Sequence, residues 1–131
     1  MTRRAYGGLA PGGGDALIST AMSWGNLLFL SGRAAVDLKT MKVVSDDFEE
    51  QARNVLDQCV EALREAGSGP EHALRVQCYL LNAEDFDTWN KLWAEYFPAP
   101  RPVRTTICTG FAVPGMLIEV EVTAGIADGP Q

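Results

Sequence analysis

Apolar and polar residues alternate most regularly in the last quarter of the chain. The run from Val103 to Thr109 alternates β-branched residues with others, and Ile118 to Ala124 alternates again. This period of two is typical of half-buried β-strands. Gly110, Pro114 and Gly115 lie between the two runs and interrupt them. We therefore expect two strands, with Arg104, Thr106 and Cys108 on one face of the first and Glu119 and Glu121 on one face of the second.

Two segments show helical spacing instead. Apolar residues recur at steps of three and four between residues 47 and 66, which predicts a helix with one apolar face. Asp46 is the expected N-cap with Glu49 as its capping-box partner, and Gly67 is the expected residue after the end. A second helix is predicted to begin at Asn82 or Glu84. Its apolar face holds Phe86, Trp89, Trp93, Tyr96 and Phe97.

The remaining pattern predicts short strands over residues 15–21, 27–30 and 73–81, with a loop over 37–44. Residues 1–14 end in three glycines and are expected to form a flexible lead-in, and residues 128–131 a loose tail. The order of elements fits one α+β domain over residues 1–131. In it, a single mixed sheet would carry two helices on one face.

Composition narrows the classes of partner. The formal net charge is −6 and no basic patch occurs, so binding to nucleic acid is not expected. No apolar run reaches the roughly 18 residues of a membrane span, and the N-terminus lacks an apolar signal region. A cytoplasmic protein without membrane association is the expectation.

The cysteines and the single histidine predict no metal site. Cys59, Cys78 and Cys108 are widely spaced and lie in apolar patterns, so each is expected to be a small buried side chain. His72 lies at a predicted strand start and is expected to be exposed. We therefore expect no metal site.

Three charged residues on the two late strands are candidates for chemistry. The planar fork of Arg104 matches a carboxylate, although the residues alone favour the alternative, a structural ion pair with a neighbouring glutamate. Glu119 could orient a water or carry a proton if it is partly buried, whereas an exposed strand face is the alternative. Glu121 allows the same two explanations with less support.

Several segments together resemble one family. Pro102-Val103-Arg104, followed about a dozen residues later by Ile118-Glu119-Val120, is similar to the signature of the RidA (YjgF-like) reactive-intermediate deaminases. Three further segments match that family in order and spacing: Gly25-Asn26 followed by an apolar run and Ser31-Gly32, the helix around Gln51–Leu56, and Asp85–Asn90 with Tyr96-Phe97.

The resemblance implies a chorismate-mutase-like fold, a homotrimer, and sites in the clefts between subunits. A trimer would cover the second face of the doubly apolar strand Leu27–Leu30. It also implies that Arg104 grips the carboxylate of a small imine or enamine acid and that Glu119 places the attacking water. Backbone groups near Thr106 would bind the substrate, and Ser31 and Asn90 would line or support the pocket. Ammonia and a 2-keto acid would be released without a cofactor.

Three positions depart from the family pattern. Ile18 stands where the family commonly has a tyrosine, Arg33 where glutamine is usual, and Thr106 where cysteine is common. Arg33 could add a second positive group and favour a dicarboxylate substrate, or it could pair with Asp37 or another acid.

Two functions remain open from the sequence. The first is a deaminase with a modified pocket, and it rests on Arg104 and Glu119. The second is a non-enzymatic trimeric protein of the same fold that binds a small ligand or another protein, and it rests on the missing tyrosine. A ribonuclease is disfavoured by the acidic chain and the single histidine.

Overall fold

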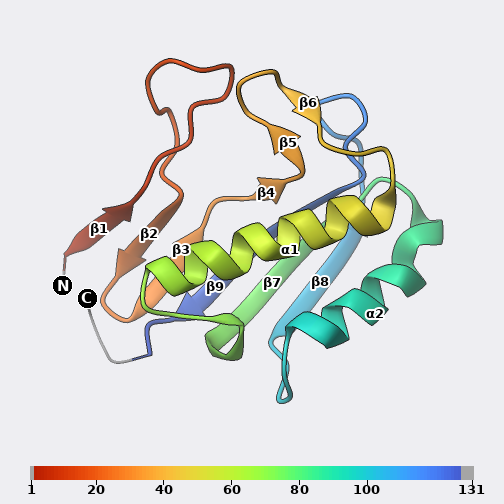
Figure 1. The fold of residues 1–131 in the computed structure, drawn as a ribbon. Helices are drawn as coiled ribbons and strands as arrows, with labels where there is room; N and C mark the ends of the chain where they lie inside the picture. The colour runs from red at the N-terminus through yellow and green to blue at the C-terminus, as the bar shows by residue number, and fades with distance from the viewer. Residues whose placement is uncertain (1, 128–131) are drawn as a thin grey trace.

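A computed structural model of the chain describes residues 2–127 and shows one large mixed sheet (Figure 1). The order of its strands is β1 (Arg3–Tyr6), β2 (Ala21–Trp24), β3 (Leu27–Leu30), β9 (Ile118–Gly125), β7 (Ala73–Leu80) and β8 (Val103–Cys108). A short strand, β4 (Arg33–Ala34), also pairs with β9 beyond the end of β3. The strands β5 (Val36–Asp37) and β6 (Lys42–Val43) form a separate two-stranded sheet.

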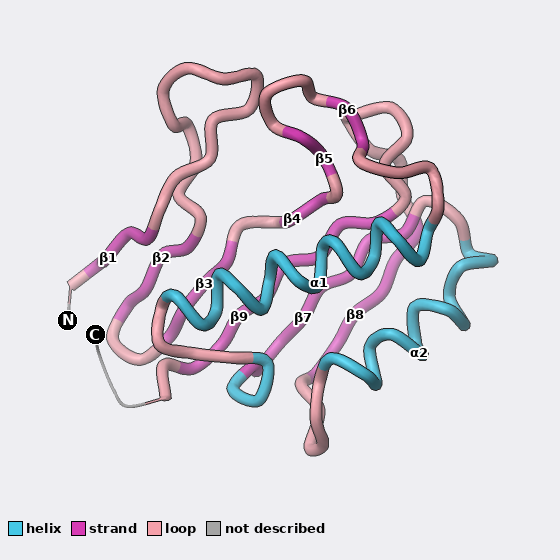
Figure 2. The backbone as a smooth tube through the Cα atoms, in the orientation of Figure 1, coloured by secondary structure: helices cyan, strands magenta, loops and turns pink. Residues whose placement is uncertain are grey.

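Two helices cover one face of the large sheet, as Figures 1 and 2 show for α1 (Phe48–Glu65) and α2 (Phe86–Tyr96). Single 3-10 turns precede β7 and α2, at Pro70–His72 and Ala83–Asp85. β7 and β8 run parallel. Parallel neighbours require a crossover connection, and the segment that contains α2 supplies it. The predicted α+β architecture with two helices on one face is confirmed, and β5–β6 is an addition to it.

The first helix begins one residue later than the sequence predicted. Asp47, and not Asp46, is the N-cap, and its carboxylate accepts a hydrogen bond from the backbone N–H of Glu50 at 3.0 Å. The Ser45 hydroxyl in turn accepts a hydrogen bond from the Asp47 N–H, and this contact holds the N-cap residue at the start of the helix. The helix ends as expected before Gly67, whose φ of 82° is the left-handed conformation that favours glycine.

The core lies between the helices and the sheet. Leu56 and Leu63 of α1, Trp89 of α2, and Val76 and Val120 of the central strands are at most 1% exposed. The alternation of the central strands therefore places their apolar side chains toward the helices, as expected from their pattern.

The other face of the sheet is open in the single chain and carries large apolar side chains. The strand register places five of these side chains on the same face, and each is between 43% and 64% exposed: Trp24, Leu27, Phe29, Val103 and Ile107. In β3, Leu28 and Leu30 are buried whereas Leu27 and Phe29 are exposed. The strand that was expected to be buried on both faces is thus buried on one face within the chain.

Four local predictions were wrong. Residues 15–20 form no strand, since Leu17 and Ile18 are exposed and only a single bridge joins Leu9 to Ile18. The expected loop over 37–44 contains β6 and the last residue of β5, and the expected lead-in contains β1, which pairs with β2. Cys108 is exposed because it ends the edge strand β8, whereas Cys59 and Cys78 are buried as predicted. The predicted loose tail, 128–131, lies outside the described residues.

Within residues 2–127, no helix combines the length and the apolar character needed to cross a bilayer.

Candidate functional site

Arg104 lies on β8 and points toward the helix layer. Its strand partner is Val76, whose side chain belongs to the core, so Arg104 shares the face that the helices cover. The guanidinium donates from Nη2 to Oδ1 of Asn90 on α2 at 2.7 Å. Its central carbon also lies 5.0 Å from the ring centroid of Trp93 and 5.6 Å from that of Phe86. Two aromatic rings and one amide therefore hold the fork in place, and its other N–H groups stay available to a carboxylate.

Thr106 follows two residues later on the same face of β8. It is paired in register with Cys78, and its Oγ1 is buried without a hydrogen-bond partner among residues 2–127. Burial raises the pKa of the Cys78 thiol to about 11, so this thiol is protonated and unreactive near neutral pH. Arg104, Asn90 and Thr106 thus lie together at the edge of the sheet, on the face that the helices cover.

Glu119 lies on β9 and points to the opposite face. Its register partners are Tyr79 on β7 and Ala34 on β4, and the side chain is half-buried. Burial, followed by the neighbouring carboxylate of Glu121, raises the pKa of Glu119 above its ordinary value. A carboxyl group in this state is a better proton carrier near neutral pH than a fully solvated one.

Glu119 is packed against a residue without a side chain. Gly32 lies in the break between β3 and β4, and a Cβ placed on it would be 2.2 Å from Oε2 of Glu119. The absence of a side chain at Gly32 is therefore what allows the carboxylate to occupy its position. Sequence reasoning used Gly32 only as part of the family motif and missed this role.

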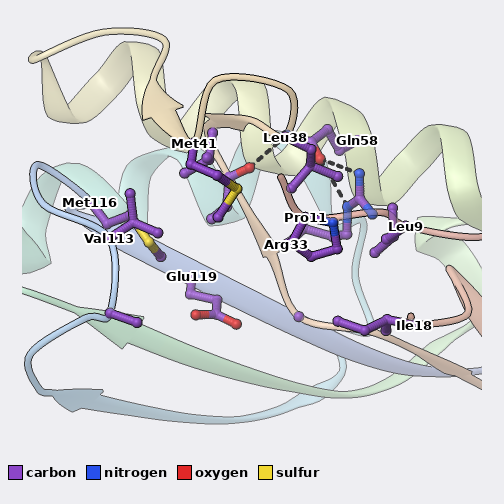
Figure 3. Close-up of a pocket in the computed structure, with 14 residues that line it drawn as sticks. Leu9, Pro11, Ile18, Arg33, Leu38, Met41, Gln58, Val113, Met116 and Glu119 are labelled. Carbon is purple, nitrogen blue, oxygen red and sulfur yellow. Dashed lines mark hydrogen bonds between the residues drawn. The ribbon is translucent and has the colours of Figure 1, made fainter. Parts of the chain in front are cut away.

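Two hollows meet at Glu119. The first has a volume of about 230 Å³ and is enclosed by the N-terminal segment, the β5–β6 turn and the loop before β9 (Figure 3). The second, about 260 Å³, lies over Tyr79, Phe111 and Glu121 on the open face. Gly32 and Ala112 also line both hollows. The carboxylate of Glu119 is thus accessible from a cavity and from the open face of the sheet.

Arg33 lies in the wall of the first cavity, beside α1 (Figure 3). It donates from Nε and Nη2 to Oε1 of Gln58 at 2.8 and 2.5 Å. Burial lowers the pKa of Arg33 from its ordinary value. Within residues 2–127, no ion pair joins Arg33 to Asp37 or to any other acid. The partner is a neutral amide, and sequence reasoning did not single out Gln58.

The last two candidate residues are Ile18, on the segment before β2, and Ser31, which directly follows β3. Ile18 lines the cavity and is 46% exposed. The Ser31 hydroxyl donates to the backbone carbonyl of Ser19 at 2.7 Å, so it anchors the segment that carries Ile18. The observed role of Ser31 is therefore to hold the segment that carries Ile18 in place.

The structure thus separates the candidates into two groups. Ile18, Arg33 and Glu119 line the first cavity, with Ser31 behind them, whereas Arg104, Thr106 and Asn90 form the cluster at β8. Arg104 and Glu119 lie on opposite faces of the sheet, so one chain does not bring them together.

Tyr79 is a further residue that the sequence analysis did not identify as part of a site. Its hydroxyl donates to Oε1 of Glu121 at 2.6 Å, next to Glu119. Pairing the predicted strand at 73–81 with that at 118–124 would have revealed this contact. Across residues 2–127, no group of three or more His, Cys, Asp and Glu side chains is placed to hold a metal ion.

Comparison with known proteins places the chain in a family. The sequence profile of the endoribonuclease L-PSP family matches residues 15–126. A RutC family protein of Pyrococcus horikoshii is 34% identical over 106 residues, which cover 81% of this chain and 84% of the relative. Reactive Intermediate Deaminase A, a chloroplastic protein of Arabidopsis thaliana, is 35% identical over 106 residues, covering 81% of this chain and 57% of that protein.

A solved structure agrees with this relationship. The crystal structure of a YjgF family protein from Neisseria meningitidis superimposes with a TM-score of 0.81 at 28% identity, covering 98% of both chains. The fold and the sequence matches lead to one conclusion. The chain belongs to the endoribonuclease L-PSP family, which includes the RidA, YjgF and RutC proteins.

Proposed function

We propose that the protein is a hydrolytic deaminase of small 2-imino and enamine carboxylic acids such as 2-aminoacrylate. The observation that carries this proposal is the half-buried carboxylate of Glu119, with its raised pKa, at the junction of two hollows. Homology to a reactive intermediate deaminase supports it. We expect it to act in the cytoplasm, without a cofactor and without nucleic acid as a partner.

The reaction needs only positioning and proton transfer. An enamine first tautomerises to the imine. Water then adds to the C=N carbon while the Glu119 carboxylate accepts a proton from it, and that proton passes to the nitrogen. The hydroxyl proton of the resulting carbinolamine then moves, again through Glu119, to the nitrogen while the C–N bond breaks, so ammonia leaves and the carbon becomes the carbonyl of a 2-keto acid. Arg104 would hold the substrate carboxylate and align the imine for attack.

The proposal requires two chains for each site. Arg104 and Glu119 lie on opposite faces of one sheet, so a substrate that touches both must lie between the Arg104 edge of one chain and the Glu119 face of another. The exposed apolar face with Leu27, Phe29 and Ile107 supplies a surface that such a neighbour would cover. We expect the homotrimer implied by the family resemblance.

The first experiment measures turnover. 2-Aminoacrylate is generated in situ from serine by a dehydratase, and the keto acid and ammonia are followed with and without the protein. Glu119→Gln should lower kcat/KM by about 10²–10⁴, the usual contribution of a positioned acid–base group. A Gln variant with unchanged turnover would remove Glu119 from the mechanism.

The second experiment tests the shared site. Arg104→Ala and Glu119→Gln chains are mixed, unfolded and refolded together. In random trimers about a quarter of the sites would receive Arg104 from one chain and Glu119 from its neighbour, and activity should return to that level. The control mixes Arg104→Ala with the double variant, which supplies no intact Arg104. Equal activity in both mixtures would contradict a shared site.

The alternative is a non-enzymatic member of the fold that binds a small ligand or a protein. Ile18 favours it, because an apolar side chain stands where related deaminases commonly have a tyrosine. A protein that binds 2-keto acids by calorimetry but leaves the rate of imine hydrolysis unchanged would establish this alternative.

A further inference from the structure

One face of α2 supplies the contacts that hold the Arg104 side chain. Phe86, Asn90 and Trp93 are separated by steps of four and three residues, so their side chains lie along one side of the helix. The central carbon of the guanidinium lies 5.6 Å and 5.0 Å from the ring centroids of Phe86 and Trp93, within the range of a cation–π interaction. Asn90 lies between these two positions and accepts the hydrogen bond from Nη2. A single helix face therefore binds the guanidinium, although Arg104 itself belongs to the sheet.

The two aromatic rings differ in how firmly the core holds them. Trp93 is 8% exposed, and its ring centroid lies 6.1 Å from that of Trp89 and 4.4 Å from that of Phe97. Phe86 is the first residue of α2 and is 42% exposed. Trp93 is thus fixed by the core, whereas Phe86 is the solvent-exposed part of the contact with Arg104. A substitution at Phe86 can therefore loosen Arg104 without opening the core.

We propose that Phe86 is a positioning residue, whose ring keeps the Arg104 guanidinium in one orientation before a ligand carboxylate binds. The inference rests on the proposed function for the ligand, and it adds a residue that acts through Arg104. Ordering a rotamer-rich side chain at the moment of binding weakens affinity by about two- to tenfold. Contacts that order the side chain beforehand remove this loss. Since Asn90 and Trp93 remain when the Phe86 ring is absent, we expect an intermediate effect of about fivefold.

Nitrogen relaxation of the Arg104 side chain, measured by NMR on the full-length protein without ligand, reports this order directly. In the unmodified protein the Nε–H group should have an order parameter near the rigid value of about 0.85. Phe86→Leu keeps an apolar side chain but removes the ring, so the order parameter should fall toward about 0.6, the value that marks flexible groups. Phe86→Tyr retains the ring and should restore the rigid value. A low order parameter in the unmodified protein, or an unchanged one in Phe86→Leu, overturns the proposal.

Ligand binding and turnover give the second readout. Phe86→Leu should weaken the binding of pyruvate, measured by calorimetry, by about fivefold. It should lower kcat/KM for 2-aminoacrylate by the same factor, because Arg104 would hold the carboxylate equally before and during the reaction. Phe86→Tyr should stay within about twofold of the unmodified protein in both measurements, since its ring can occupy the same place over the guanidinium.

Leu81→Ala is the matched control. Leu81 is 41% exposed, as Phe86 is 42%, and it follows Leu80, whose partner on β8 is Cys108 and not Arg104. Its Arg104 order parameter and its affinity for pyruvate should equal those of the unmodified protein. An equal fall in Leu81→Ala would indicate general loosening of the fold and would remove the specific role of the ring.

The outcomes separate this inference from the proposed function. If the order parameter falls in Phe86→Leu while pyruvate affinity and kcat/KM stay unchanged, the order of Arg104 does not matter for the ligand, and the inference fails with the deaminase intact. If the order parameter falls in Phe86→Leu and returns in Phe86→Tyr, but no form of the protein hydrolyses 2-aminoacrylate, the proposed function fails and Phe86 still positions Arg104.

Discussion

The contact between Gly32 and Glu119 allows a perturbation of activity that leaves the fold unaffected. In Gly32→Ala, the new Cβ would lie 2.2 Å from Oε2 of Glu119, whereas carbon–oxygen contacts close only to about 3.3 Å. The carboxylate must therefore move by about 1 Å. A displacement of this size at a catalytic group costs about 10²-fold in rate, so we expect kcat/KM to fall by that factor.

Stability should respond differently. The backbone of Gly32 is not in the left-handed region, and the clashing atom belongs to the end of a flexible side chain next to open space. Alanine also reduces the conformational entropy of the unfolded chain, which is worth about 0.4–1 kcal/mol of stability at a compatible site. The melting temperature of Gly32→Ala should therefore equal or slightly exceed that of the unmodified protein.

The assay measures imine hydrolysis and thermal unfolding on the same preparations. Gly125→Ala is the matched control, because a Cβ on Gly125 would meet its nearest atom at 3.9 Å, its backbone is also compatible with alanine, and it lines neither hollow at Glu119. It should retain full activity. A Gly32→Ala protein that is folded and hydrolyses imines at the unmodified rate would refute the view that the position of the Glu119 carboxylate limits the reaction.

Three further predictions concern the charged groups. Glu121→Gln removes one of the two causes that raise the pKa of Glu119, so the acid limb of the kcat/KM profile should move to lower pH; an unmoved limb would contradict this coupling. Folding raises the pKa of Glu119, so the charged form of this side chain destabilises the folded state at pH values above the raised pKa. Well below the ordinary value of 4.5 the side chain is protonated in both states, and this destabilisation is absent. Glu119→Gln should therefore raise the free energy of unfolding at pH 7, with the gain absent near pH 3 in denaturant titrations. Arg104→Ala should cost about 2–5 kcal/mol of transition-state binding, and Arg104→Lys should recover little of it because lysine lacks the fork; wild-type kinetics in the alanine variant would make Arg104 structural.

Periodicity was sufficient to predict the long elements. The helix predicted over residues 47–66 is observed at Phe48–Glu65, and the strand predicted at 73–81 is observed at Ala73–Leu80. The two-residue strands β4, β5 and β6 were missed because they are too short for any alternation. Their positions depend on backbone pairing with distant segments, which a local pattern does not encode.

The candidate site shows a different limit of sequence reasoning. Alternation correctly grouped Arg104 with Thr106 and placed Val103 with Ile107, but it does not say which group faces the helices. In β8 the apolar pair is exposed, at 64% and 46%, and the arginine faces the helix layer. This is the reverse of the arrangement in the central strands. The reason is tertiary: at the edge of the sheet, Asn90 and the ring of Trp93 replace aliphatic core and give the guanidinium its partners.

The reversed strand has a consequence for how copies of the chain can combine. In a two-fold interface the same patch of both chains is buried, so Arg104 of one chain reaches Glu119 of the other only where that patch includes both the β8 edge and the open face. A cyclic interface joins two different surfaces, so the β8 edge of one chain can meet the open face of the next. Such a ring would bury Val103 and Ile107 and bring each Arg104 toward a neighbour's Glu119. Such a ring would account for both the exposed apolar side of β8 and the inward arginine, and the mixing experiment tests its premise that Arg104 and Glu119 of different chains share a site.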